Sequence, residues 1–138
     1  GFKIVDQSKL KNFKIQSLII TGEKRINYKL KNKLLSKSNN TDKRSIIIEI
    51  DTSKIKSVNE KNIKNEITKY QLEITVNLKF YETDNNIQNN FTVIESGNYL
   101  VSEKYSQTLN NERKLVETLV ENIANKITNN LIQKFNDL

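Results

Sequence analysis

The sequence contains no cysteine, no histidine and no proline, and it has only three glycines among its 138 residues. Without cysteine there are no disulfides and no thiol chemistry. Without histidine the chain lacks the most common general base and the most common metal ligand. Three scattered glycines cannot build a phosphate-binding loop or a glycine-rich nucleophile elbow, and the carboxylates do not cluster at metal-ligand spacing. We therefore expect a protein that is not an enzyme and that uses no metal or other cofactor.

Long hydrophobic runs and linkers are missing as well. No run of 18 apolar residues occurs, so we expect no membrane-spanning helix. The chain has no internal repeat, and the scarcity of glycine and proline leaves no linker that would divide it. Its length fits one core. We expect a single domain over residues 1–138, in which residues 1–12 form an extended N-terminal segment.

The charge is unbalanced, with 23 basic and 16 acidic side chains and a net charge of +7. This balance favours an anionic partner such as nucleic acid or acidic lipid. However, 20 of the basic residues are lysines, and abundant Asn, Lys and Ile also fit an A/T-rich genome. Residues 1–69 carry +10 and residues 70–138 carry −3. This predicts a polarised molecule, unless the two halves interleave in the fold.

The first predicted strand spans residues 13–20. Its apolar residues fall on both faces, with Phe13, Ile15 and Ile19 on one and Leu18 and Ile20 on the other. Apolar side chains on both faces are typical of a strand that is covered on both sides.

A helix and a second strand follow. Apolar residues recur every four positions over residues 23–37, which predicts a helix, and isoleucines fill a strand over 45–51. Strand, helix and strand together favour a right-handed crossover with the two strands parallel. Residues 52–66 are rich in Lys and Asn and fit either a loop or a ragged extension of the strand.

The second half gives the clearest patterns. Residues 70–81 alternate strictly between apolar and polar, which predicts a strand with one buried face. A turn over 84–86 leads to an antiparallel partner over 91–103, which we expect to bend or bulge at Gly97. Asn110–Asn111 would cap a final helix of about 24 residues whose apolar side chains recur every four positions.

The predicted order is β-α-β-β-β-α, which defines the α+β class. We expect a four-stranded sheet with two helices packed on one face, in a two-layer sandwich. The polar face of the strand over 70–81 has a single aromatic residue, Tyr81, at its end. A sheet that stacks nucleic-acid bases needs exposed aromatics among basic residues, so we expect no nucleic-acid partner.

Three stretches connect this order of elements with a known family: Gly1–Ile4, Tyr70–Asn77 and Asn110–Leu131. Gly1–Ile4 resembles the residues just after the lipidated cysteine of LptE-type lipoproteins. Tyr70–Asn77 looks like the central strand of that family, and Asn110–Leu131 is similar to its long closing helix. The resemblance covers the whole chain in element order.

The resemblance implies a partner and a location. LptE-like proteins sit as a plug inside LptD, a large transmembrane β-barrel, where they assist barrel assembly and contact lipopolysaccharide. The chain would be anchored on the periplasmic side of the outer membrane by a lipidated cysteine preceding Gly1. A plug needs a polar exterior because barrel interiors are polar, and the strand over 70–81 offers a polar face.

Lipopolysaccharide carries phosphates and acidic sugars, which basic side chains can bind. The candidate residues flank the strand over 70–81 and the last helix, where ordinary solvated lysines would give the same pattern. They are Lys61, Lys64, Lys69, Lys104, Arg113 and Lys114. Two alternatives remain for comparison: an auxiliary lipoprotein of another envelope transport system and, on net charge alone, a basic nucleic-acid-binding module.

Overall fold

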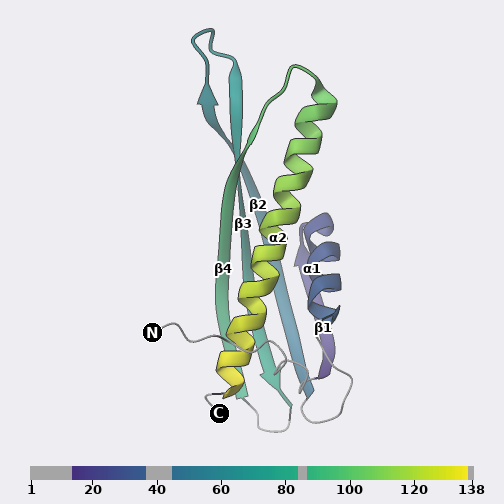
Figure 1. The fold of residues 1–138 in the computed structure, drawn as a ribbon. Coiled ribbons are helices and arrows are strands. Elements are labelled where there is room, and N and C mark those ends of the chain that lie inside the picture. The colour runs from purple at the N-terminus through teal and green to yellow at the C-terminus, as the bar shows by residue number, and fades with distance from the viewer. Residues whose placement is uncertain (1–13, 37–44, 84–86, 137–138) are drawn as a thin grey trace.

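The computed structural model describes residues 14–36, 45–83 and 87–136. The elements are β1 (Lys14–Gly22), α1 (Lys24–Ser36), β2 (Ser45–Lys61), β3 (Ile67–Glu82), β4 (Ile87–Leu100) and α2 (Tyr105–Asn136). This is the predicted β-α-β-β-β-α order, and the strands form one sheet in the order β1-β2-β3-β4 (Figure 1). The α+β class is confirmed. The predicted N-terminal segment 1–12 and the predicted turn 84–86 lie outside the described residues.

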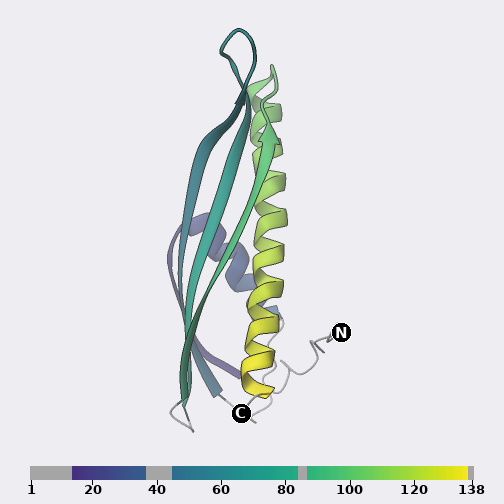
Figure 2. The ribbon, with the colours of Figure 1, turned by 90° about the vertical axis from the view of Figure 1, so that its left-hand side faces the viewer.

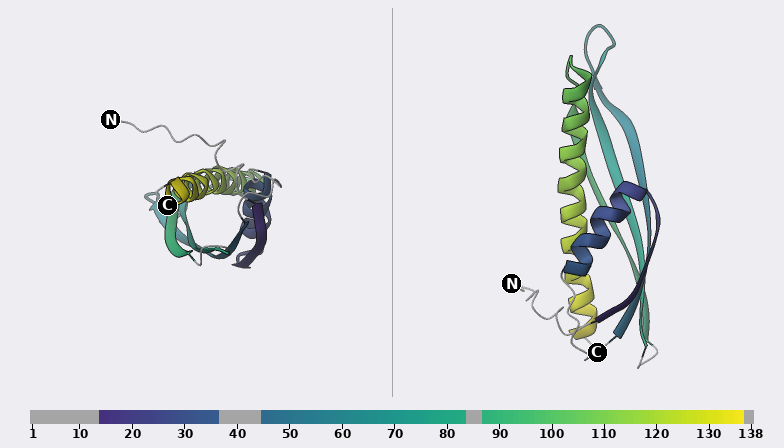
Figure 3. Two further views of the ribbon diagram at one scale, coloured as in Figure 1. Left: turned by 90° about the horizontal axis from the view of Figure 1, so that it is seen from below. Right: turned by 90° about the vertical axis from the view of Figure 1, so that its right-hand side faces the viewer.

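The sheet is mixed, because it contains both parallel and antiparallel neighbours. β1 and β2 are parallel and are joined through α1, whereas β2–β3 and β3–β4 are antiparallel neighbours. Both helices lie on the same face of the curved sheet, which we call the inner face (Figures 2 and 3). The opposite, outer face has no helix over it in the part of the chain that the structure describes.

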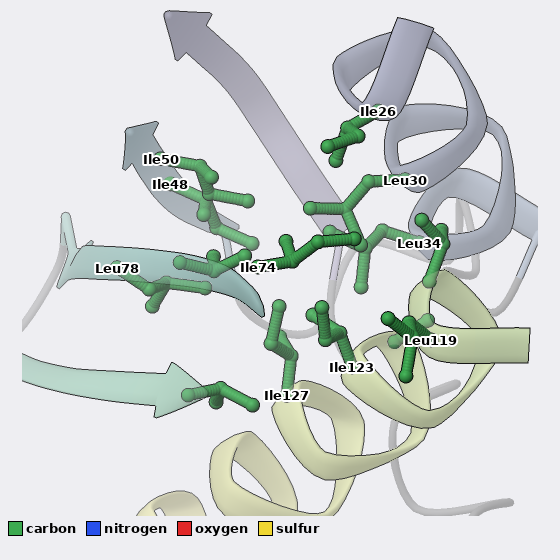
Figure 4. Packing of buried hydrophobic residues seen from close by; sticks show 14 of the residues in the cluster. Ile26, Leu30, Leu34, Ile48, Ile50, Ile74, Leu78, Leu119, Ile123 and Ile127 are labelled. Atoms are coloured by element: carbon green, nitrogen blue, oxygen red, sulfur yellow. The ribbon is translucent and has the colours of Figure 1, made fainter. Parts of the chain in front are cut away.

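The core lies between the inner face and the two helices. Every second residue of β2 and β3 points inward, because side chains alternate along a strand, and the helices add one stripe each. Figure 4 shows side chains of α1 and α2 converging on those of the strands. The fully buried large side chains are Leu30, Leu34, Ile46, Ile48, Leu72, Ile74, Leu78, Phe80, Ile123, Ile127, Leu131 and Ile132.

The prediction that β1 is covered on both sides is wrong. A register irregularity between Ile15 and Ser17 shifts the alternation by one residue. Ile15, Leu18 and Ile20 therefore all pack against the core, while Ile19 is 50% exposed on the other face. One inserted residue in a strand reverses the face of every residue beyond it. The alternation of apolar and polar residues in the sequence gave no sign of this insertion.

The ambiguous stretch 52–66 is mostly strand. β2 continues to Lys61 and pairs with β3 along this length. β1 pairs with β2 only as far as Gly22 opposite Thr52. The second half of β2 therefore has β3 as its single strand neighbour among the described residues.

Gly97 does not cause the expected bulge. The pairing of β4 with β3 runs without a register shift past Gly97, and β4 ends at Leu100, short of the expected 103. A Cβ atom at Gly97 would lie 2.7 Å from Cδ1 of Leu115 in α2. The glycine serves the close approach of the helix to the strand, not a bend.

The helix α2 begins earlier than its expected caps. It starts at Tyr105 and has 32 residues, or roughly 48 Å at the helical rise. The Lys104 carbonyl accepts the first backbone bonds, and the Ser102 amide donates to the Thr108 hydroxyl. Asn111 lies within the helix, where its side-chain amide donates to the Leu100 carbonyl at 3.0 Å. The expected capping role of the asparagines is therefore wrong.

No helix among the described residues is both long and apolar enough to cross a membrane.

Candidate functional site

The candidate site lies at one end of the elongated molecule. The β2–β3 turn, the end of β4 and the start of α2 meet there (top of Figure 1). We call this region the hairpin end; it comprises residues 53–73 and 97–114. It is opposite the end at which the described chain stops in α2 (Figure 2).

The turn between β2 and β3 is held by one asparagine. The side-chain oxygen of Asn62 accepts bonds from the backbone amides of Lys64 and Glu66, both at 2.9 Å. Asn65 has a φ of 65°, a left-handed conformation that asparagine tolerates better than most residues. This ordered turn holds Ile63 at its tip, where the side chain is 101% exposed.

The two groups of predicted basic residues come together at the hairpin end. Lys61 and Lys64 lie at and beside the turn, and Lys69 is near the start of β3. Lys104 directly precedes α2, and Arg113 and Lys114 follow in its third turn. The β3–β4 pairing brings the groups together, because Lys69 pairs with Leu100 and the Val101 amide donates to the Thr68 carbonyl at 2.9 Å.

These cations differ in their partners. The ammonium of Lys69 lies 3.4 Å from the carboxylate of Glu60. The Thr68 hydroxyl donates to the same carboxylate at 2.8 Å, and this bond, followed by Lys69, lowers the pKa of Glu60. Among the described carboxylates, none forms an ion pair with Lys61, Lys64 or Lys104, so these three remain available to an external anion.

Exposed apolar side chains gather in the same region. Ten large hydrophobic residues are exposed in the described chain, and six of them belong to the hairpin end. These six are Ile55, Val58, Ile63, Leu100, Tyr105 and Leu109. Single exposed apolar residues are normal. Here Ile63 directly precedes Lys64 and Tyr105 directly follows Lys104, so apolar and basic side chains are neighbours in the chain at this end.

A cluster on the inner face joins this end to α2. The ammonium of Lys56 lies 4.3 Å from the ring centroid of Tyr70 and 5.8 Å from that of Tyr99. The two rings are 5.6 Å apart, and Lys56 is also 4.0 Å from the Glu112 carboxylate. The adjacent Tyr99 phenol raises the pKa of Lys56, and burial raises the pKa of Tyr99. Lys56 thus connects the two tyrosines of the sheet with Glu112 of α2 on the inner face.

Sequence reasoning missed Lys56, because it placed this residue in an irregular stretch. The signal was the alternation in β2, whose even-numbered residues Ile46, Ile48 and Ile50 point inward. Lys56 is also even-numbered, so its side chain points to the same face, and it lies opposite Leu72 of β3. A lysine at an inward position near the end of a strand would have indicated a charged or aromatic neighbour.

The sequence halves with opposite charge interleave in space. Lys29 and Lys33 of α1 form ion pairs with Glu117 and Glu121 of α2. Lys56 and Glu112 add a third contact between the halves. The asymmetry along the sequence is therefore partly cancelled in the fold.

The described residues contain no group of three or more acidic side chains placed to hold a metal ion. What the hairpin end offers is a set of exposed cations beside exposed apolar groups. Such a surface can bind an anion that also carries apolar parts.

Solved structures share this architecture. The rare lipoprotein B from Shewanella oneidensis superposes with a TM-score of 0.66 at 12% identity, covering 88% of this chain and 98% of its own. A putative lipoprotein from Caulobacter crescentus gives 0.65 at 14%, covering 95% of both chains. Lipoprotein B from Nitrosomonas europaea gives 0.56 at 14%, covering 99% and 93%. The chain therefore has a fold found in bacterial lipoproteins.

The family itself follows from the sequence comparison. The model of the LptE family, described as lipopolysaccharide-assembly, matches residues 10–131. The chain belongs to this family and is a lipopolysaccharide-assembly lipoprotein of the cell envelope. A comparison with curated proteins found no match.

Proposed function

We propose that this domain is the plug of an LptD-like outer-membrane β-barrel and that its hairpin end contacts lipopolysaccharide during transport. The observation that carries the proposal is the family match over residues 10–131. The domain would be anchored on the periplasmic side of the outer membrane, with the lipid on a cysteine ahead of Gly1.

The outer face of the sheet supports a position inside a barrel. Glu73, Thr75, Asn77 and Lys79 of β3 alternate with its buried residues and point away from the helices. The Thr92 hydroxyl of β4 donates to the Asn77 side chain at 2.7 Å on this face. Because the lumen of an outer-membrane barrel is polar, the polar outer side of β3 is compatible with it. The other strands add the exposed apolar side chains Ile19, Ile55 and Ile94 to the same face.

The hairpin end supports contact with lipopolysaccharide. Lys61, Lys64 and Lys104 can pair with phosphates, while Ile63 and Tyr105 can contact acyl chains. Arg113 and Lys114 are exposed on α2 and extend the basic surface along the helix. Lys69 contributes less, since it already pairs with Glu60.

Photo-crosslinking in living cells tests the two contacts separately. A photoreactive amino acid at Asn77, exposed on the outer face, should attach to a large barrel protein. The same group at Lys64 should attach to lipopolysaccharide. Lys31 is exposed on α1, on the side of the molecule that carries the helices, and serves as the comparison position for both adducts.

Two outcomes would contradict the proposal. The plug position fails if neither Asn77 nor Lys31 yields a barrel adduct. The lipid contact fails if Lys64 gives no more lipopolysaccharide adduct than Lys31.

A further inference from the structure

β2 has a free edge that begins at Thr52. Gly22 is the last residue of β1 that pairs with β2, and it lies opposite Thr52. Its φ is +106°, and a Cβ atom there would lie 2.0 Å from the Thr52 carbonyl oxygen. Only glycine fits this position, so the end of the β1–β2 ladder is fixed by the sequence. The chain then turns into α1, whose first residue is Lys24.

Beyond this point β2 stays a regular strand for six residues. Ser53–Val58 pairs with β3 in unbroken register, and a bulge at Asn59 follows. Six residues is a common strand length. On the side away from β3, the backbone donors and acceptors of Ser53–Val58 have no strand partner among the described residues.

The side chains of this segment are sorted between the two faces. Lys54 and Lys56 point to the inner face, in phase with Thr52. Ile55 points to the outer face and is 59% exposed. Val58 is 46% exposed. Lysines on an edge discourage pairing with a second copy, because two copies would place like charges opposite each other.

We propose that Ser53–Val58 is a strand-addition site for an extended, acidic segment of a partner protein. The partner would carry a carboxylate facing Lys54 and, next to it, an apolar residue facing Ile55. Lys56 is already held by Tyr70, Tyr99 and Glu112. Backbone bonds supply the affinity and the alternating side chains supply the specificity. The site does not depend on the plug proposal, because its geometry belongs to the domain alone.

A synthetic peptide tests the site directly. The probe is a nine-residue peptide of alternating glutamate and valine, added to the full chain at low salt. Amide NMR shifts and hydrogen exchange report where it binds. We expect shifts and slowed exchange concentrated at Ser53–Val58. The variant Lys54→Glu should bind about fivefold more weakly, whereas Lys31→Glu, an equal charge change on α1, should bind as the wild type does.

Two controls keep the test specific to strand addition. A fully N-methylated version of the peptide keeps the charges but has no amide donors, so it should not bind. Equal binding of this version would show charge attraction alone and overturn the proposal. So would shifts centred on β1 or β4, or the absence of any shift at millimolar peptide.

Discussion

Gly97 in β4 lies directly beneath Leu115 in α2. A Cβ atom on Gly97 would approach Cδ1 of Leu115 to 2.7 Å, which is closer than side chains pack. The long helix can approach β4 this closely because the strand has no side chain at this position. The contact fixes the distance between the two layers near the hairpin end.

Gly97→Ala should therefore lower the free energy of unfolding by about 1 kcal/mol, the lower range for overpacking. Leu115→Ala should restore room for the new methyl group. In urea unfolding, the double variant should be more stable than the sum of the two single changes predicts. Strict additivity would show that the helix and strand do not meet at this pair.

Thr52 ties the end of β1 to the start of α1. Its buried hydroxyl accepts from the Glu23 amide at 3.0 Å, donates toward the Thr21 carbonyl at 3.3 Å, and contacts the Asn27 side chain. Thr52→Val keeps the shape and removes the hydroxyl.

We expect Thr52→Val to cost about 1–3 kcal/mol, because it leaves buried polar groups unpaired. Thermal or urea unfolding measures the loss. Thr75→Val, on the outer face of β3, is the matched control and should change stability little. Equal effects of the two variants would contradict the role of Thr52.

The turn of the β2–β3 hairpin should weaken in acid. The hydrogen bond from the Thr68 hydroxyl is the main cause that holds the pKa of Glu60 below its ordinary value, and the nearby Lys69 ammonium is the second cause. The ionised carboxylate thus stabilises the folded hairpin above its unfolded-state pKa, and this contribution is lost as the pH falls through the lower folded-state pKa. NMR titration of Glu60 should give a midpoint below the ordinary value, and Thr68→Val should raise that midpoint. An unchanged midpoint in Thr68→Val would rule out the hydroxyl as the cause.

The lysines of the hairpin end should govern lipopolysaccharide binding. Reversing Lys64 and Lys104 together should weaken binding by about tenfold at low salt, because neither lysine has an internal ion-pair partner among the described residues. Lys31→Glu changes an exposed lysine on α1, outside the hairpin end, and should leave binding unchanged. Binding to immobilised lipopolysaccharide, measured at two salt concentrations, checks this. Equal weakening by Lys31→Glu would mean that overall charge, not this surface, is responsible.

The long periodic segments could be predicted from the sequence. The alternation in β3 and the four-residue spacing in α1 and α2 each have one buried face, and the hydrophobic effect alone dictates those patterns. The order of elements and the parallel crossover followed from them. The sequence also named Lys64 and Lys104 as candidates, but that they lie at the same end became visible only in the β3–β4 pairing of the structure.

The rest depends on tertiary contacts that leave little local signal. The bulge after Ile15 reverses a face without changing composition. The second half of β2 lacks apolar alternation, because α1 does not extend over it and Lys54 and Lys56 occupy its inner positions. The early start of α2 relies on a bond from the Ser102 amide to Thr108, which resembles any serine- and threonine-containing loop in sequence.

Affinity purification tests the central claim most directly. The tagged full-length precursor would be expressed in its own cells, extracted from outer membranes in detergent, and its partners quantified by mass spectrometry. The plug proposal predicts one large outer-membrane barrel protein in a roughly one-to-one ratio, retained at high salt. Recovery of the lipoprotein without a barrel, or with an inner-membrane transporter instead, would contradict it and favour an auxiliary role in another envelope transport system.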